Sequence, residues 1–205
     1  MMKKILIAML FLMAFGAVDA QKIKQIQPKT EDILQMLEIA GYKLYVWDLS
    51  FLGNKDYDAV FSVREYDKYG YVSDGFMTYT MNNLPTHKMW KTMSMGFTPV
   101  QVQDTIHIEN VQITVAGMGS LGYPLVLLPL QRNGLKEYHY AYRPIAIDKF
   151  ETDKFIPIAF YGSAFLTEDG GVRFCGDSII PSNLDSDICR MSPHYYIIGV
   201  TFKKL

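Results

Sequence analysis

The sequence predicts a mainly β protein: an antiparallel β-sandwich or open barrel with one N-terminal α-helix, with an α+β fold as the alternative. Aromatic residues make up 14% of the chain, including 14 Tyr and 12 Phe, and half-buried sheets favour such side chains. Apolar and polar residues alternate over many short runs, which is the period of a strand. Turn residues separate these runs at short intervals, as in sandwiches and open barrels.

Residues 1–20 have the three parts of a secretory signal peptide. Lys3 and Lys4 precede an apolar run over residues 5–15, and the small side chains of Val18 and Ala20 form a cleavage site. A membrane-spanning helix needs about 20 apolar residues, and this run is shorter. We therefore expect cleavage after Ala20 and no transmembrane segment afterwards. The signal predicts an exported protein, periplasmic or secreted. Because no cysteine stands directly after the apolar run, we expect that it is not a lipoprotein.

Residues 21–205 are expected to form a single β-rich domain, and a division into two lobes near residues 82–99 is the alternative. Cleavage of the signal would leave 18 basic and 20 acidic residues, a net charge of −2. A nucleic-acid partner usually demands a basic surface, so we expect no nucleic acid among the partners. No motif predicts a cofactor, and we expect none.

One helix is expected, from Thr30 to Gly41. Thr30 is a suitable N-cap residue, Glu31 and Asp32 favour the first turn, and Gly41 is a C-terminal stop. The apolar side chains recur at helical spacing and would form one face: Ile33, Leu34, Leu37 and Ala40.

The remaining pattern predicts strands separated by turns, with residues 82–96 irregular. The strands are expected at residues 43–49, 59–66, 76–81, 100–103, 106–108, 111–116, 125–130, 138–147, 156–166, 172–174 and 195–202. Asn133-Gly134 is a strong signal for a tight hairpin turn.

Gly117, Gly119 and Gly122 have the spacing of a dinucleotide-binding fingerprint after a predicted strand. That fingerprint requires a helix to follow, so that its N-terminus meets the pyrophosphate. Tyr123-Pro124 and another apolar strand follow instead. We therefore interpret the glycines as a flexible loop between two strands.

Two segments carry oxygen ligands at alternate positions, as calcium loops do. They are Asn54, Asp56, Asp58 and Asn183, Asp185, Asp187. Both lack the glycine and the distal Glu of such loops, and Asn and Asp are ordinary turn residues, so we expect turns and no metal. The second segment is the better calcium candidate, because the disulfide predicted below closes around it.

Cys175 and Cys189 are the two cysteines of the chain, and export would deliver them to an oxidising compartment. We expect them to form a disulfide with each other. A bridge over a loop of about 15 residues contributes on the order of 3 kcal/mol to stability. Two independent buried thiols are the alternative.

No group of residues matches a complete catalytic motif, and we predict no catalytic residue. His107 and Glu109 would share one face of a strand as an acid/base or ligand pair, although an ordinary strand pair explains them as well. A hydrolase is the alternative, and it could use Asp148, Glu151 and Asp153, or His194. Glycoside hydrolysis requires two carboxylates at a suitable separation, which this cluster could supply.

Several segments resemble a family of small exported proteins from Bacteroidetes-type gut bacteria, classed as a domain of unknown function. The resemblance is carried by residues 142–145, 155–164, 173–176 and 192–199, with a similar first hairpin at residues 45–49 and 63–66. It implies export and a β-rich domain over most of the mature chain, and it transfers no catalytic residue.

These observations favour a non-catalytic exported module that binds a glycan, a peptide or an envelope partner through tyrosine-rich surface. A hydrolase that uses the carboxylates or His194 is one alternative. A surface-assembly subunit is the other.

Overall fold

The computed structural model describes residues 27, 29–52, 57–79, 92–115, 118–147, 149 and 151–204. The chain divides into two compact units, residues 1–35 and residues 36–205, and each is considered by itself. The predicted signal peptide, residues 1–20, lies outside the described residues. Among those described, no helix is long and apolar enough to cross a membrane.

The predicted N-terminal helix is present as α2 (Thr30–Ile39). Its first backbone hydrogen bond runs from Ile33 N–H to the Lys29 carbonyl, at 3.2 Å, so Lys29 and not Thr30 is the N-cap residue. The Lys29 N–H donates to Oδ2 of Asp32 at 2.7 Å, which satisfies a backbone donor at the cap. The expected capping role of Thr30 is therefore wrong.

Gly41 ends this helix as predicted, because its φ of +89° is a left-handed conformation that glycine adopts without strain. Its N–H donates to the Glu38 carbonyl, and the Tyr42 N–H donates to the Leu37 carbonyl, both at 2.9 Å. This pair of bonds satisfies the last carbonyls of the helix and leads directly into the first strand.

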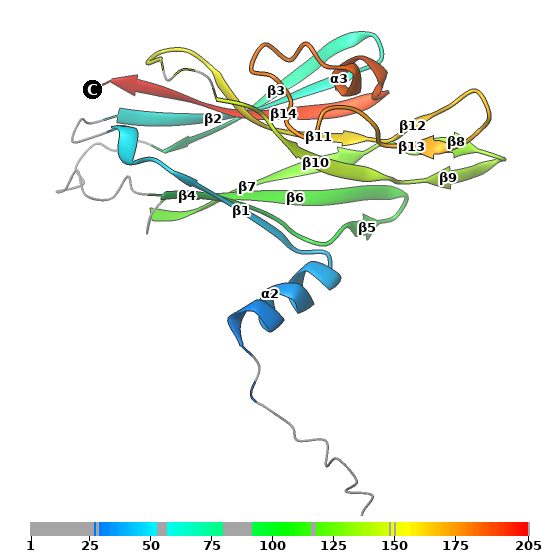
Figure 1. The fold of residues 1–205 in the computed structure, drawn as a ribbon, viewed down its shortest axis with the longest axis horizontal. Coiled ribbons are helices and arrows are strands. Elements are labelled where there is room, and N and C mark those ends of the chain that lie inside the picture. Colours follow the sequence, from blue (N-terminus) through cyan, green and yellow to red (C-terminus); the bar gives the residue numbers. More distant parts are fainter. Residues whose placement is uncertain are drawn as a thin grey trace, which may run out of the picture. The chain divides into compact units, whose positions relative to one another are not determined.

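The first sheet is antiparallel and contains β1 and the strands from β4 to β7 (Figure 1). β6 is its central strand: β4 and β5 pair with one edge of it, β7 pairs with the other, and β1 lies outside β4. The strands are β1 (Lys43–Asp48), β4 (Thr92–Phe97), β5 (Gln101–Gln103), β6 (Ile106–Val115) and β7 (Met118–Leu127).

The second sheet is also antiparallel, in the order β10-β11-β14-β2-β3. Its strands are β2 (Tyr57–Asp67), β3 (Gly70–Tyr79), β10 (Tyr140–Pro144), β11 (Ile156–Ser163) and β14 (His194–Lys204). Two small hairpins and two short helical turns complete the fold: β8 (Leu130–Arg132) with β9 (Leu135–Glu137), β12 (Phe165–Leu166) with β13 (Val172–Arg173), η1 (Ser50–Leu52) and α3 (Asp187–Met191).

Some elements differ from the sequence-based expectation. β4 occupies the end of the stretch predicted to be irregular, and β6 is continuous where two strands were expected. Gly119 and Gly122 lie within β7, so the flexible-loop interpretation is wrong for them, while Gly117 lies outside the described residues. The Asn133-Gly134 turn is confirmed, since both residues have a positive φ, 51° and 77°.

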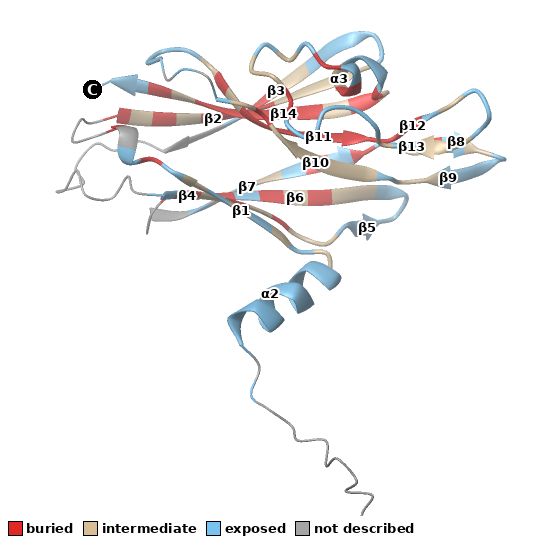
Figure 2. Cartoon of the chain, in the orientation of Figure 1, coloured by how far each residue is buried: buried red, intermediate tan, exposed pale blue. Residues whose placement is uncertain are grey.

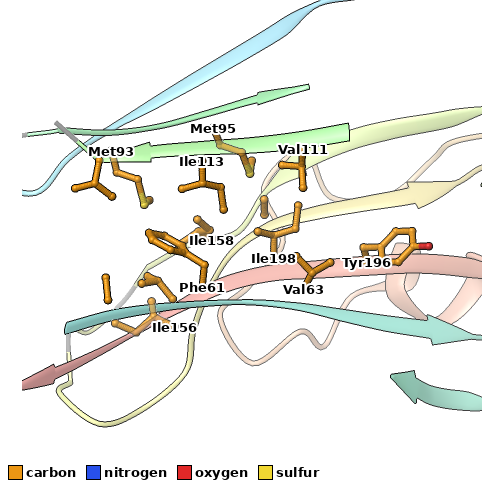
Figure 3. Packing of buried hydrophobic residues seen from close by; sticks show 14 of the residues in the cluster. Phe61, Val63, Met93, Met95, Val111, Ile113, Ile156, Ile158, Tyr196 and Ile198 are labelled. Atoms are coloured by element: carbon orange, nitrogen blue, oxygen red, sulfur yellow. The ribbon is translucent and has the colours of Figure 1, made fainter. Parts of the chain in front are cut away.

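The main core lies between the two sheets, which makes the fold a β-sandwich and confirms the predicted class. Figure 2 shows buried stretches along the strands of both sheets, and Figure 3 shows how their side chains meet. Met93, Met95 and Ile113 of the first sheet face Phe61 and Ile158 of the second. Burying these side chains stabilises the sandwich by roughly 1.5–3 kcal/mol each.

A second, smaller core covers the other face of the second sheet. Phe160 and Ile197 alternate along their strands with residues of the main core, so they point to the opposite face. They pack with Ile145, Ile180 and Ile188, and Ile188 belongs to α3. The segment that includes α3 therefore buries a face that would otherwise be exposed.

Candidate functional site

In three strands, the series of alternate residues that point into the sandwich ends with a titratable side chain. In β6, Glu109 follows the buried positions Val115, Ile113 and Val111 at the same spacing of two. In β2, Glu65 extends the series of buried positions that ends at Val63. His194 is the corresponding inward residue of β14. At these positions, the apolar interior of the sandwich becomes polar.

Glu109 is buried, with 3% of the residue exposed, and Tyr161 of β11 donates a hydrogen bond to its Oε2 atom. Burial raises the pKa of the Glu109 carboxyl, and this effect is opposed by the Tyr161 hydrogen bond and the charge of Lys43. Burial also raises the pKa of Tyr161, and the neighbouring Glu109 charge adds to the effect. Tyr161 is therefore a hydroxyl donor and not a phenolate.

A pocket of about 210 Å³ lies beside Glu109, and we call it the Glu109 pocket. Its polar lining comes from both sheets and from the residues that precede β10: Lys43, Glu109, Tyr138, Tyr140 and Tyr161. Its remaining walls are mostly apolar: Gly41, Pro99, Val100 and Leu127. The pocket therefore combines one cation, one buried carboxyl group and three tyrosines.

The tyrosine rings of the pocket are held by neighbouring rings. Tyr140 stacks on Tyr161 with 5.4 Å between ring centroids, and Tyr138 stacks on His107 with 3.5 Å between centroids. The ammonium nitrogen of Lys43 lies 6.0 Å from the centroid of the Tyr161 ring. The pocket is thus lined by ring surfaces whose positions are set before any ligand arrives.

Tyr140 connects the pocket to a partly buried hydrogen-bond chain. The Leu128 N–H donates to the Tyr140 oxygen at 3.0 Å, and the Tyr140 hydroxyl lies 2.5 Å from Nδ1 of His194. Nε2 of His194 lies 3.0 Å from Oε1 of Glu65, whose Oε2 accepts from the Ser73 hydroxyl at 2.9 Å. If Tyr140 donates to Nδ1, the proton of a neutral His194 is on Nε2 and points to Glu65.

The structure places the predicted pair His107 and Glu109 on one face of β6 but gives them separate partners. His107 stacks on Tyr138, and Glu109 accepts from Tyr161. Of the other histidines, His139 pairs with Glu137 at 2.9 Å on the surface, and His87 lies outside the described residues. No hydrogen bond joins His107 to Glu109, so the structure does not hold the two as a hydrogen-bonded pair.

The structure describes two members of the predicted carboxylate cluster, Glu151 and Asp153. Asp148 lies outside the described residues, and Glu151 is exposed and forms an ion pair with Lys154. The Lys154 hydrogen bond lowers the pKa of Glu151, whereas a general acid needs a raised one. Asp153 has a φ of +63°, and its N–H donates to the Phe202 carbonyl. His194 is bonded elsewhere, as described above.

The second calcium candidate forms a salt-bridged turn. The side chain of Asn183 accepts a hydrogen bond from the Asp185 N–H at 3.0 Å, and Arg190 pairs with both Asp185 and Asp187. The guanidinium group thus neutralises the carboxylates that a cation would need. The first candidate lies outside the described residues apart from Asp58. Across the described part of the chain, no cluster of three or more His, Cys, Asp or Glu residues is arranged to hold a metal ion.

Cys175 and Cys189 are both free thiols in the structure, so the predicted disulfide is not formed there. Cys175 is exposed after β13, while Cys189 lies on α3 and packs against the smaller core. Burial raises the pKa of the Cys189 thiol to about 11. The two thiols have separate environments, which spacing along the sequence does not reveal.

Several residues of the pocket had not been predicted: Lys43, Tyr138, Tyr140 and Tyr161. Glu65, which completes the hydrogen-bond chain, had not been predicted either. One signal was available, because Glu65, Glu109 and His194 occupy positions where alternation calls for an apolar residue. A polar side chain at such a position needs a hydrogen-bond partner inside the protein. The identity of that partner is not visible in the pattern.

The fold and the pocket define an antiparallel β-sandwich domain with a polar, tyrosine-lined pocket between its sheets. The chain belongs to the family described as a domain of unknown function, DUF5041, which matches residues 12–204. No curated protein and no solved structure matches the chain. The expectation of a family of unknown function is thus confirmed, while its link to export and to gut bacteria stays a prediction.

Proposed function

We propose that this chain is an exported, non-catalytic binding module, and that the Glu109 pocket holds a group of its glycan, peptide or envelope partner. The observation that carries the proposal is the position of Glu109, which is 3% exposed and still lines a pocket. Burying an ionisable group costs stability, so such a group beside a pocket is typical of a functional site.

The tyrosines give the pocket the chemistry of a binding surface. Each ring has a large apolar body with few rotamers to immobilise. The hydroxyls of Tyr140 and Tyr161 already have partners within the protein, which fixes the two rings. Tyr161 occupies one oxygen of the Glu109 carboxyl group, and the other can accept a hydrogen bond from a ligand. Lys43 adds a donor from β1, a strand of the same sheet as Glu109.

The hydrogen bonds of His194 favour binding over catalysis. His194 is 2% exposed, and its two ring nitrogens have Tyr140 and Glu65 as partners. A general base must reach the proton that it removes from the substrate. We therefore assign His194 a positioning role that holds Tyr140 at the pocket. The surface-assembly alternative stays a prediction, which the molar mass in solution would test.

Binding is tested by NMR titration of the protein, expressed from the full 205-residue chain, with panels of oligosaccharides, peptides and soluble envelope fragments. We expect a ligand to shift the amide signals of Lys43, Glu109 and Tyr138. Glu109→Gln keeps the shape of the side chain but removes its charge, and we expect at least about tenfold weaker binding. Glu151→Gln, a surface carboxylate with an ion-pair partner, is the control and should bind normally.

A ligand whose shifts map away from the pocket, or whose affinity survives Glu109→Gln, would overturn the assignment of the site. Export is tested separately, by fractionating cells that express the whole chain and sequencing the N-terminus of the product. We expect material outside the cytoplasm that begins at Gln21. A product that stays in the cytoplasm and begins at Met1 would contradict export.

A further inference from the structure

The Glu109 pocket carries one charge of each sign, and the two charges do not neutralise each other by direct contact. Lys43 and Glu109 both line it, and the Lys43 charge acts on the Glu109 carboxyl group. Among the salt bridges of the described residues, none joins Lys43 to Glu109. A ligand placed between them can therefore engage both.

The side of the pocket around Glu109 has the chemistry that recognises an ammonium group. A carboxylate accepts charge-assisted hydrogen bonds from ammonium, and tyrosine faces attract a cation. The rings of Tyr138, Tyr140 and Tyr161 line the pocket together with Glu109. The chain itself provides an example, because the Lys43 ammonium lies 6.0 Å from the centre of the Tyr161 ring.

The rest of the pocket limits the size and polarity of its ligand. About 210 Å³ corresponds to roughly seven waters at ~30 Å³ each, so the group that enters the pocket is about the size of one small residue. Pro99, Val100 and Leu127 form an apolar wall. A ligand that fills the pocket thus needs a short aliphatic part as well as its charged groups.

We infer that the Glu109 pocket binds a zwitterionic α-amino acid unit with a small aliphatic side chain. Its ammonium group faces Glu109 and the tyrosine rings, its carboxylate faces Lys43, and its side chain lies along Val100 and Leu127. The unit can be a free amino acid or one displayed with both charges on a larger molecule. This inference rests on the proposed function and names the ligand class of the same pocket.

The test uses calorimetry and NMR on the protein with four probes. L-leucine carries both charges, 3-methylbutylamine lacks the carboxylate, 4-methylpentanoate lacks the ammonium group, and glucose is neutral. We expect leucine to bind at least about tenfold more tightly than either singly charged analogue, because each loses a charge-assisted hydrogen bond. We expect glucose to be weaker still.

Two variants test which side chain of the pocket binds each charged group of leucine. Glu109→Gln should reduce the preference for leucine over 4-methylpentanoate, and Lys43→Met should reduce the preference for leucine over 3-methylbutylamine. Lys43 is only half-buried, so Lys43→Met keeps the test available if the Glu109 variant does not fold. Glu151→Gln should change neither preference.

The outcomes separate this inference from the proposed function. If glucose or a singly charged analogue binds the pocket as tightly as leucine, the amino-acid inference is wrong and the binding site stands. If leucine does not bind but an oligosaccharide or peptide of the wider panel shifts the amide signals of the pocket residues, the amino-acid inference is again wrong and the binding site stands. If no ligand of either panel shifts those signals, both are wrong.

Discussion

Individual polar residues inside the sandwich are tolerated because each has a hydrogen-bond partner within the protein. Glu109 has Tyr161, and His194 has Tyr140 on one side and Glu65 on the other. An isolated buried polar group costs about 1–3 kcal/mol, so removing one partner is more damaging than removing an exposed side chain. This asymmetry makes single hydroxyl deletions informative at this site.

Tyr161→Phe tests the partner of Glu109. The variant keeps the ring and its stacking on Tyr140 but leaves the carboxyl group without its donor. We expect the free energy of unfolding, measured by urea denaturation at pH 7, to fall by about 1–3 kcal/mol. Tyr69→Phe is the matched control, because Tyr69 is 85% exposed, and it should be neutral. Equal effects of the two substitutions would contradict the assigned role of Tyr161.

Glu109 also makes stability depend on pH. Because burial raises its folded-state pKa, the unfolded chain releases this proton at a lower pH than the folded chain does. The Glu109 contribution is therefore fully present below the usual glutamate pKa of about 4.3 and is lost as pH rises through the raised value. We expect urea denaturation over this window to show wild-type stability falling relative to Glu109→Gln.

Glu151 provides a control of opposite sign for that measurement. Lys154 lowers the pKa of Glu151, so its contribution is present above the usual glutamate pKa and is lost as pH falls. Glu151→Gln should thus leave the Glu109-dependent decrease in place. Parallel pH profiles for the wild type and Glu109→Gln would contradict a buried Glu109 with a raised pKa.

Among the secondary-structure elements, β4 shows how pairing can decide a strand. Its sequence, Thr-Met-Ser-Met-Gly-Phe, has no β-branched residue after Thr92 and contains a glycine, so local preference for a strand is weak. Met93, Met95 and Phe97 nevertheless alternate inward, and β1 and β6 pair with the two edges. Burial between two neighbours therefore outweighs propensity.

The short helix α3 has a measurable consequence for the thiols. It holds Cys189 half-buried, with a thiol pKa of about 11, while Cys175 is exposed. The thiolate is the reactive form, so at about pH 8 we expect fast labelling of Cys175 and slow labelling of Cys189. Cys175→Ser should remove the fast phase, and Cys189→Ser should retain it. Absence of free thiols in the unfolded, unreduced protein would instead establish the disulfide.

For the molecule as a whole, one contact between the sheets depends on a missing side chain. Gly75 of β3 lies against the ring of Tyr123 from β7, and a Cβ atom there would overlap that ring. Gly75→Ala must displace Tyr123, and we expect it to cost about 1–3 kcal/mol, as overpacking usually does. Thermal and urea denaturation would measure the loss.

Gly122→Ala is the matched control for this substitution. Gly122 also lies in a strand, but nothing stands within 4 Å of the position that its Cβ would take. We expect Gly122→Ala to be neutral or slightly stabilising, because alanine has less conformational freedom to lose on folding. A similar loss of stability in both variants would show that close packing on Tyr123 is not the cause.

The sequence by itself determined the fold class, the period of most strands, the glycine that ends α2 and the Asn133-Gly134 turn. These features depend on local backbone preference and on alternation, which short stretches of chain carry by themselves. The tertiary structure decided which polar residues meet: Glu65 and His194 are 129 positions apart, and Tyr140 and His194 are 54 apart. Alternation shows that a side chain points inward, but the order of the strands selects its neighbour. That order brings distant segments of the chain together around a common core, so the pocket could not be predicted from any one segment.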